Sequence, residues 1–339
     1  MQSRLNRENK ANNNHTHHYY AKSNSVKWLA YATAAGMLLV LLMGALVTKT
    51  DSGRGCGDDW PLCNGKFIPA YTIESMIEYS HRFVTGVIGI ILLVTVVQVF
   101  RYVKRKDARF YALASAFFTV VQSIMGAFAV VWPQSDGVMA LHFGISLLAF
   151  SSTFLLAVVV RQWHLEAGAA RTATGLEGAN DGESGREGGI PQVSSGFAAG
   201  IWLITVYCYL VVYIGAYVRH SESYGGCSGW PLCNGRIIPE LAGAPGIVFG
   251  HRVAALLLFI AVLWLYIASV RRMDRASFIR KSALWALILV ILQVLSGAFV
   301  TLAYTENMTL LASLLHTMIV SALFAVLCLL CSISVRLRN

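Results

Sequence analysis

Eight long apolar stretches alternate with short polar segments along the chain. They cover residues 28–47, 83–100, 111–132, 137–160, 197–218, 253–270, 282–305 and 307–335. A helix needs about 20 apolar residues to cross the hydrocarbon core of a bilayer, and these stretches are close to that length or longer. The strands of a membrane barrel would instead alternate apolar and polar residues in short segments. The pattern predicts an all-α integral membrane protein with eight transmembrane helices.

Basic residues are unevenly distributed over the segments between the apolar stretches, and this predicts how the chain sits in the membrane. Lysine and arginine are concentrated before residue 28, at 101–109, at 271–281 and after residue 335. With eight spans, these four segments fall on the same side. An excess of positive charge marks the cytoplasmic side, so we expect both termini in the cytoplasm.

The same pattern divides the chain into two halves. We expect a polar cytoplasmic tail at 1–27, a four-helix half at 28–161, a second four-helix half at 197–335 and a short cytoplasmic tail at 336–339. Residues 162–196 are rich in glycine and slightly acidic, which predicts a flexible cytoplasmic linker between the halves.

Composition supports the membrane interpretation. The chain is 56% hydrophobic and 13% charged, whereas soluble proteins are about 25% charged. The net charge of +10 would suit a nucleic-acid-binding protein, but the basic residues lie in short loops between apolar stretches. We therefore expect no nucleic-acid partner, and we expect membrane lipid around the helices. The first apolar stretch is long enough to stay in the membrane, so no cleavable signal peptide is expected.

The two halves contain an internal repeat. The sequence CGDDWPLCNGKFIP at 56–69 recurs as CSGWPLCNGRIIP at 227–239. Further pairs at nearly the same spacing are His81-Arg82 with His251-Arg252, Gln122-x-x-x-Gly126 with Gln293-x-x-x-Gly297, and His142 with His316. Because each half has an even number of spans, the two halves have the same orientation in the membrane. The repeat therefore predicts two parallel four-helix bundles. Inverted-repeat transporters are disfavoured for the same reason.

Four of the nine histidines recur in register in or beside the apolar stretches: His81, His142, His251 and His316. Ionisable side chains in membrane spans are costly and usually functional. Each pair would lie at similar depth and can supply the two axial ligands of one haem iron. The neighbouring Arg82 and Arg252 would lie at the outer interface, where guanidinium groups can pair with haem propionates. Copper or zinc is less favoured, because each half offers only two histidines and the second bundle has no matching carboxylate or thiol.

One position distinguishes the halves. Glu78 precedes His81 by three residues and shares its helical face, whereas the equivalent residue of the second half is Val248. A carboxylate beside a haem can move protons or stabilise a cation during oxidation. The first half is therefore predicted to be the site of the reaction, and the second half is predicted to support it. The alternative for Glu78 is an ordinary acid at the membrane interface.

Each of two outer loops has a pair of cysteines, Cys56 with Cys63 and Cys227 with Cys233. An oxidising outer face permits disulfides at these positions. The residues alone leave a structural and a redox role equally open. The remaining cysteines, Cys208, Cys328 and Cys331, lie in apolar stretches and are interpreted as packing residues.

Taken together, these residues resemble the haem A synthase family, in particular its cysteine-bearing bacterial branch. The resemblance extends from about residue 28 to 335. It rests on the eight spans, Thr-Asp-Ser-Gly at 50–53, the twin WPLCNG sequences, Glu78-x-x-His81-Arg82 and the four histidines. It implies a bacterial cell-membrane oxidoreductase that converts the C8 methyl group of haem O to a formyl group by successive hydroxylations. The product, haem A, serves terminal oxidases.

The resemblance also implies a role for each site residue. His81 and His142 would hold the substrate haem O, His251 and His316 would ligate a haem b cofactor, and Glu78 would assist the oxidation. The Cys56–Cys63 pair would exchange electrons, and the Cys227–Cys233 pair would be structural. Contact with haem O synthase, the identity of the electron acceptor and assembly into a homo-oligomer are left open.

Two other functions share the histidine framework. A dihaem cytochrome b would carry electrons without chemistry on its haem and would not need Glu78. A haem transporter or chaperone would bind haem and release it intact. Haem extracted from membranes that contain the chain and a source of haem O separates the three functions, because only an enzyme yields hydroxylated or formyl haem.

Overall fold

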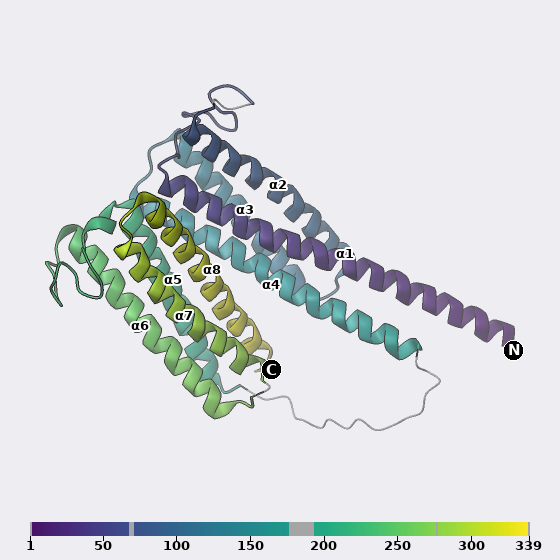
Figure 1. Cartoon of the computed structure of the whole chain (residues 1–339). Helices are drawn as coiled ribbons and strands as arrows, with labels where there is room; N and C mark the ends of the chain where they lie inside the picture. Colours follow the sequence, from purple (N-terminus) through teal and green to yellow (C-terminus); the bar gives the residue numbers. More distant parts are fainter. Residues whose placement is uncertain (1, 68–70, 176–192, 276, 338–339) are drawn as a thin grey trace.

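A computed structural model describes residues 2–67, 71–175, 193–275 and 277–337. In these ranges the chain forms eight α-helices and one short 3-10 helix, η1 (Figure 1). The helices are α1 (Gln2–Lys49), α2 (Ile73–Tyr102), α3 (Lys106–Val131), α4 (Asp136–Gly175), α5 (Ser195–His220), α6 (Gly243–Arg272), α7 (Phe278–Leu302) and α8 (Glu306–Arg336), with η1 at Ser223–Gly225. All eight α-helices contain a segment long and apolar enough to cross a membrane. The prediction of an all-α, eight-helix membrane protein is confirmed.

The helices pack as two groups of four. In the first group, α1 contacts α2, α2 contacts α3, α3 contacts α4, and α4 returns to α1. Helices α5 to α8 make the same four contacts in the second group. The groups meet where α4 packs on α5 and α8 and where α1 packs on α8. This arrangement is compatible with two repeated four-helix bundles.

Local sequence explains where several helices begin and end. Thr72 caps α2 by accepting a hydrogen bond from the backbone N–H of Ser75, and Thr305 caps α8 by accepting one from Met308. Both helices have an acidic residue in the first turn and an arginine in the last. These charges oppose the partial charges at the two helix ends and so stabilise both helices.

Helices α2 and α6 begin about ten residues before the apolar stretches that predict them. The predicted stretches start at 83 and 253, whereas the helices start at Ile73 and Gly243. The first turns of α2 contain the charged residues Glu74, Glu78 and Arg82, so the apolar pattern does not extend over them. His81 and His251, which precede the predicted apolar stretches, therefore lie inside helices α2 and α6.

Helix α4 continues into the segment predicted as a linker. Its helical backbone extends to Gly175, and Trp163 and His164 are buried. The Ser23 hydroxyl of α1 lies 3.0 Å from His164 Nδ1, so packing on α1 extends the helix beyond the apolar stretch. Residues 176–192 of the predicted linker lie outside the described residues. The segment predicted as a polar tail has a helical backbone from Gln2.

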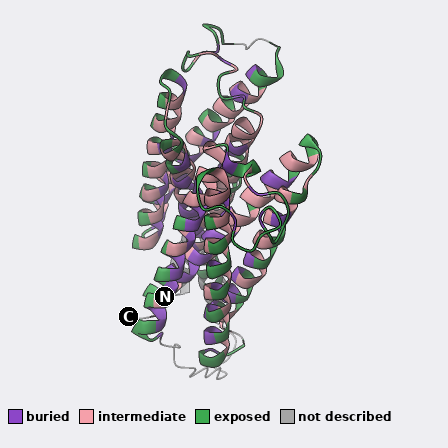
Figure 2. Cartoon of the chain, turned by 90° about the vertical axis from the view of Figure 1, so that its left-hand side faces the viewer, coloured by how far each residue is buried: buried purple, intermediate pink, exposed green. Residues whose placement is uncertain are grey.

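The outward faces of the helices are apolar. On α2, the side chains of Phe83, Ile90 and Leu93 are 60–66% exposed and follow one another at helical spacing. Figure 2 shows exposed positions along the outer sides of the helices, with buried positions turned toward their neighbours. Lipid tails cover such faces in a membrane, where every backbone polar group must be paired inside the helix.

Candidate functional site

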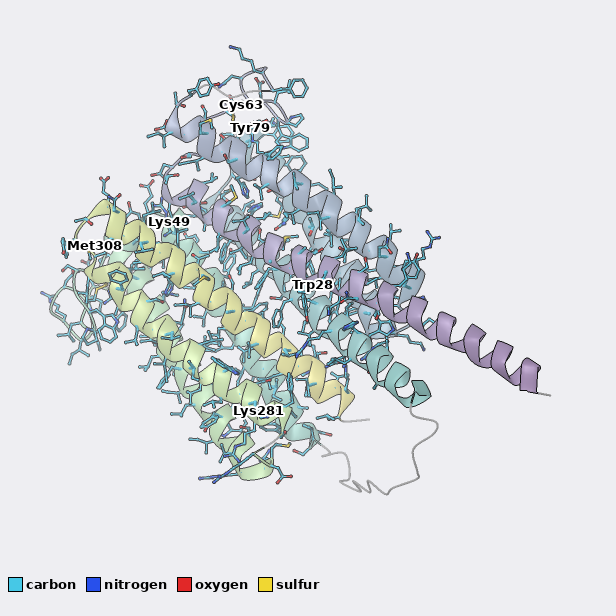
Figure 3. All side chains as sticks on the ribbon, turned by 45° about the vertical axis from the view of Figure 1, so that its right-hand side comes forward. Trp28, Lys49, Cys63, Tyr79, Lys281 and Met308 are labelled. Atoms are coloured by element: carbon cyan, nitrogen blue, oxygen red, sulfur yellow. A yellow bond between two sulfur atoms is a disulfide. The ribbon has the colours of Figure 1, made fainter. Side chains whose placement is uncertain are left out.

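Two loops of similar structure lie at one end of the molecule. We call residues 56–67 the first WPLCNG loop and residues 227–239 the second. The structure pairs Cys56 with Cys63 and Cys227 with Cys233 as disulfides. Figure 3 shows Cys63 at the same end of the molecule as Met308, with Lys281 at the opposite end.

The two loops turn in the same way. The N–H of Cys63 donates to the carbonyl of Lys66, and that of Cys233 donates to the carbonyl of Arg236, at 3.0 and 3.1 Å. After each of these cysteines follows an Asn-Gly pair with positive φ: 51° and 72° at Asn64 and Gly65, 54° and 75° at Asn234 and Gly235. Asparagine and glycine tolerate this left-handed conformation better than other residues. The repeated sequence thus encodes a repeated turn.

Each loop is tied to the helix that follows it by an arginine. Arg82 Nη1 donates to the carbonyl oxygens of Asp59 and Leu62, both at 2.8 Å. Arg252 reaches the equivalent carbonyls of Gly229 and Leu232 at 3.0 and 3.1 Å. Both arginines also line the cavity described below. Their propionate contacts remain a prediction, and their visible role is to anchor the loops.

Glu78 is a buried carboxylate whose two oxygens are both partnered. Oε1 lies 2.5 Å from Arg82 Nη2, and Oε2 accepts a hydrogen bond of 2.8 Å from the backbone N–H of Cys56. The side chain is 4% exposed. These two contacts hold the carboxylate in one position beside the first WPLCNG loop. In the second half, Val248 packs against Cys227 and Cys233 in place of this ion pair.

A cavity of about 1690 Å³ extends through both halves and brings the predicted residues together. Its walls include every residue of the predicted histidine, arginine and glutamate set: Glu78, His81, Arg82, His142, His251, Arg252 and His316. Pockets for a single small ligand usually measure about 300–1,000 Å³. The volume therefore suits two large ligands or one very large one. The four loop cysteines are not among its lining residues.

The histidines enter the cavity at similar depths along their helices. His81 and His251 each follow the first residue of their helix by eight positions, counted from Ile73 and Gly243. His142 follows the start of α4 by six positions and His316 that of α8 by ten. At a rise of about 1.5 Å per residue, the four depths differ by roughly 6 Å. The sequence expectation of similar depth agrees with these positions.

Each of these histidines packs against a glycine of the preceding helix. A Cβ atom added at Gly44, Gly126 or Gly297 would lie 3.3, 3.4 or 3.2 Å from Cε1 of His81, His142 or His316, respectively. One added at Gly215 would lie 2.8 Å from Cε1 of His251. Carbon atoms in favourable contact are about 3.5–4.0 Å apart, so a larger residue would displace the imidazole. The structure thus has four equivalent cradles, one for each histidine.

The donor set fits haem better than an isolated metal ion. Among the described residues, no group of three or more His, Cys, Asp or Glu side chains could hold a metal ion. A protein site for zinc needs three or four such ligands, whereas a haem iron needs only one or two axial ones. Nδ1 of His81, His142 and His251 is buried without a hydrogen-bond partner. The free imidazoles, their glycine cradles and the large cavity fit two haem groups.

Sequence reasoning missed several residues of the site. Gly44 and Gly215 were detectable, because Gly-Ala-x-Val at 44–47 recurs at 215–218. Arg219 and Lys49 also line the cavity. Arg219 Nη2 donates to the Thr48 carbonyl at 2.6 Å and to Asp51 Oδ1 at 3.0 Å, joining the ends of α5 and α1. Its sequence signal was a cation directly after an apolar stretch.

Known proteins resemble this chain over most of its length. The family described as cytochrome oxidase assembly protein (COX15-CtaA) matches residues 27–180. A Heme A synthase of Symbiobacterium thermophilum is 40% identical over 309 residues, which cover 91% of this chain and 94% of the relative. The Heme A synthases of Shouchella clausii and Alkalihalophilus pseudofirmus are 38% and 37% identical, and each alignment covers 89% of this chain and 95% of the relative. The chain therefore belongs to the haem A synthase family of cytochrome oxidase assembly proteins.

Proposed function

We propose that this protein is a membrane oxidoreductase that converts haem O to haem A. It oxidises the C8 methyl group to a formyl group by successive hydroxylations, and the product serves terminal oxidases. The observation that carries the proposal is the cavity lined by all four repeated histidines and by Glu78. The similarity to Heme A synthases over about nine-tenths of the chain supports the same reaction.

The two halves have different tasks in this proposal. His81 and His142 hold the substrate haem O, and His251 and His316 hold a resident haem b. When bound, haem b supplies a redox centre for electron transfer. The division is supported by Glu78, which lies one helical turn before His81 and has only Val248 as its equivalent near His251.

Glu78 assists the oxidation through its fixed negative charge. Arg82 and the Cys56 amide hold the carboxylate at the cavity wall, where its charge can stabilise positive charge that develops at the oxidised carbon. The carboxylate can also take up a proton released there if the Arg82 contact opens.

Cations at the outer end of the cavity would receive the haem propionates. Arg82 and Arg252 are the predicted partners, and Lys49 and Arg219 line the same cavity. Arg219 Nε is buried without a hydrogen-bond partner. Guanidinium groups form short, charge-assisted hydrogen bonds with carboxylates, which would fix the depth and rotation of each haem.

The cysteine pairs also differ in this proposal. The Cys56–Cys63 pair exchanges electrons, and the Cys227–Cys233 pair is a structural staple. The first pair is coupled to Glu78 by the hydrogen bond from the Cys56 amide, whereas the second packs against Val248. The outer loops then face the oxidising side of a bacterial cell membrane, and both termini lie in the cytoplasm.

Conversion of haem O tests the proposed reaction. The full chain is expressed in membranes that contain a haem O source, and haems are extracted and separated by chromatography. We expect hydroxylated haem O and haem A, neither of which forms in membranes without the chain. If haem O is bound but remains unmodified, the protein is a carrier or a chaperone. If only haem b is found and spectra show its reduction and reoxidation, an electron-carrying cytochrome is the better description.

The glycine cradle of His251 gives a second expected result. A Cβ atom at residue 215 would come within 2.8 Å of the imidazole, so Gly215→Ala should displace His251 and lower the resident haem b content of the purified protein. Gly250→Ala is the matched control, because a Cβ atom there has no neighbour within 4 Å. Haem b is measured per mole of protein by reduced-minus-oxidised spectra. Equal haem content in both variants would contradict a cradle role for Gly215.

A further inference from the structure

The four imidazoles differ in what their Nδ1 atoms contact. Nδ1 of His81, His142 and His251 is buried without a hydrogen-bond partner. Nδ1 of His316, in contrast, lies 2.9 Å from the hydroxyl oxygen of Ser296, a buried residue of α7. Ser296 is therefore a specific neighbour of only one of the four proposed haem ligands.

The hydrogen bonds around Ser296 determine which nitrogen of His316 has the proton. Ser296 Oγ donates its single proton to the backbone carbonyl of Gln293, at 2.9 Å. The oxygen can then only accept, so Nδ1 of His316 must be the donor. Nε2 consequently has no proton, and its lone pair is the one that an iron ion requires.

The other side of the same ring agrees with this assignment. The side-chain nitrogen of Gln293 lies 2.9 Å from His316 Nε2. An amide nitrogen donates and does not accept, so Nε2 is the acceptor in this contact as well. The contacts with Ser296 and Gln293 therefore agree on one tautomer of His316, with its lone pair on Nε2.

The first half lacks this arrangement. The repeat aligns Gln293-Val-Leu-Ser296-Gly297 with Gln122-Ser-Ile-Met125-Gly126. Met125 stands at the position of Ser296, and a thioether is at most a weak acceptor. Gln122 Nε2 contacts Met37 Sδ at 3.7 Å instead of the histidine. His142 is thus held by its glycine cradle, and nothing described in the structure specifies its tautomer.

We propose that Ser296 is a positioning residue that fixes His316 as a permanent iron ligand, whereas Met125 leaves His142 free to bind and release its haem. The inference rests on the proposed function and extends it. Histidine ligands of metals commonly donate their second N–H to a fixed acceptor, which orients the ring and makes the ligating nitrogen more basic. A resident cofactor needs such a fixed ligand, and a substrate haem that must leave after oxidation does not.

The test measures how firmly haem b is held. The variants S296A and S296T are made in the H81A/H142A background, where only the second half can hold haem. The purified holoprotein is mixed with excess apomyoglobin, and haem transfer is followed by absorbance. Loss of the hydrogen-bond partner of a metal-binding histidine typically weakens metal binding about 10- to 100-fold. We therefore expect haem release from S296A to be on the order of 10-fold faster, with S296T close to the parent.

A redox titration supplies a readout other than retention. Without the hydrogen bond the imidazole is a weaker donor to ferric iron, so the S296A midpoint potential should shift to a more positive value. The reciprocal variant M125S, made in the H251A/H316A background, should slow haem release from the first half.

Two results would overturn the inference and can be told apart. If S296A retains haem b with the parent's release rate and potential, Ser296 has no positioning role, although the haem assignment stands. If the H81A/H142A background contains no haem b, the assignment of the resident haem to the second half is wrong, and the Ser296 inference falls with it.

Discussion

Glu78→Gln is expected to stop the formation of hydroxylated haem O and haem A while the haem b spectrum stays intact. Glutamine keeps the size of the side chain and can still accept from the Cys56 amide, but it removes the negative charge beside His81. Proton transfer and charge stabilisation by one side chain typically contribute about 100- to 10,000-fold to a rate. We expect a loss of at least about 100-fold, measured by chromatography of extracted haems.

The control for this variant lies one turn earlier on the same helix. Glu74 is an exposed residue in the first turn of α2, so Glu74→Gln changes the same charge away from the cavity wall and should preserve activity. Because Glu78 also ties the first WPLCNG loop to α2, thiol labelling must show that the Cys56–Cys63 disulfide persists in Glu78→Gln. If Glu78→Gln forms product at the wild-type rate, a catalytic role for Glu78 is ruled out. Loss of all haem would indicate a structural one.

Replacing either histidine of the second half is expected to remove the resident haem b signal. His251→Ala and His316→Ala each delete one of two axial ligands proposed for the same iron. The remaining imidazole cannot by itself maintain a six-coordinate, low-spin centre. The low-spin b-type absorbance of the purified protein should therefore be lost or converted to a high-spin form, and activity should fall with it.

His164→Ala is the matched control for these variants. His164 is also a buried histidine, but it packs near Ser23 and is not among the residues that line the cavity. Its replacement should leave the haem b spectrum unchanged. An unchanged spectrum in His251→Ala or His316→Ala would instead contradict the assignment of these two residues to the resident haem.

The apolar pattern was sufficient to predict the eight helices but not where they begin. The first turns of α2 contain charged residues that belong to the site, and burial against neighbouring elements keeps them helical. The extension of α4 to Gly175 has a similar origin, since His164 packs on α1 rather than facing solvent. Boundaries set by tertiary contacts cannot be read from local hydrophobicity.

The candidate site was predictable where the repeat marked it. The duplication identified the four histidines and showed that Glu78 has Val248 as its equivalent. The four histidines and Glu78, which are the ligand and catalytic candidates, all line one cavity. Contacts between helices were not predictable. The cradle of His251 by Gly215 and the bond from His316 to Ser296 depend on side chains from different helices. Likewise, the sequence indicated that Arg82 lies near the outer interface but not that it anchors a loop.

The central claim is that the halves are unequal, with substrate in the first and a resident haem b in the second. The haem composition of purified protein from cells that supply haem O tests it most directly. We predict that the wild-type chain yields haem b together with haem O or its oxidised products, and that H81A/H142A yields haem b alone. If H81A/H142A loses haem b, or still contains haem O or haem A, the division of tasks between the halves is wrong.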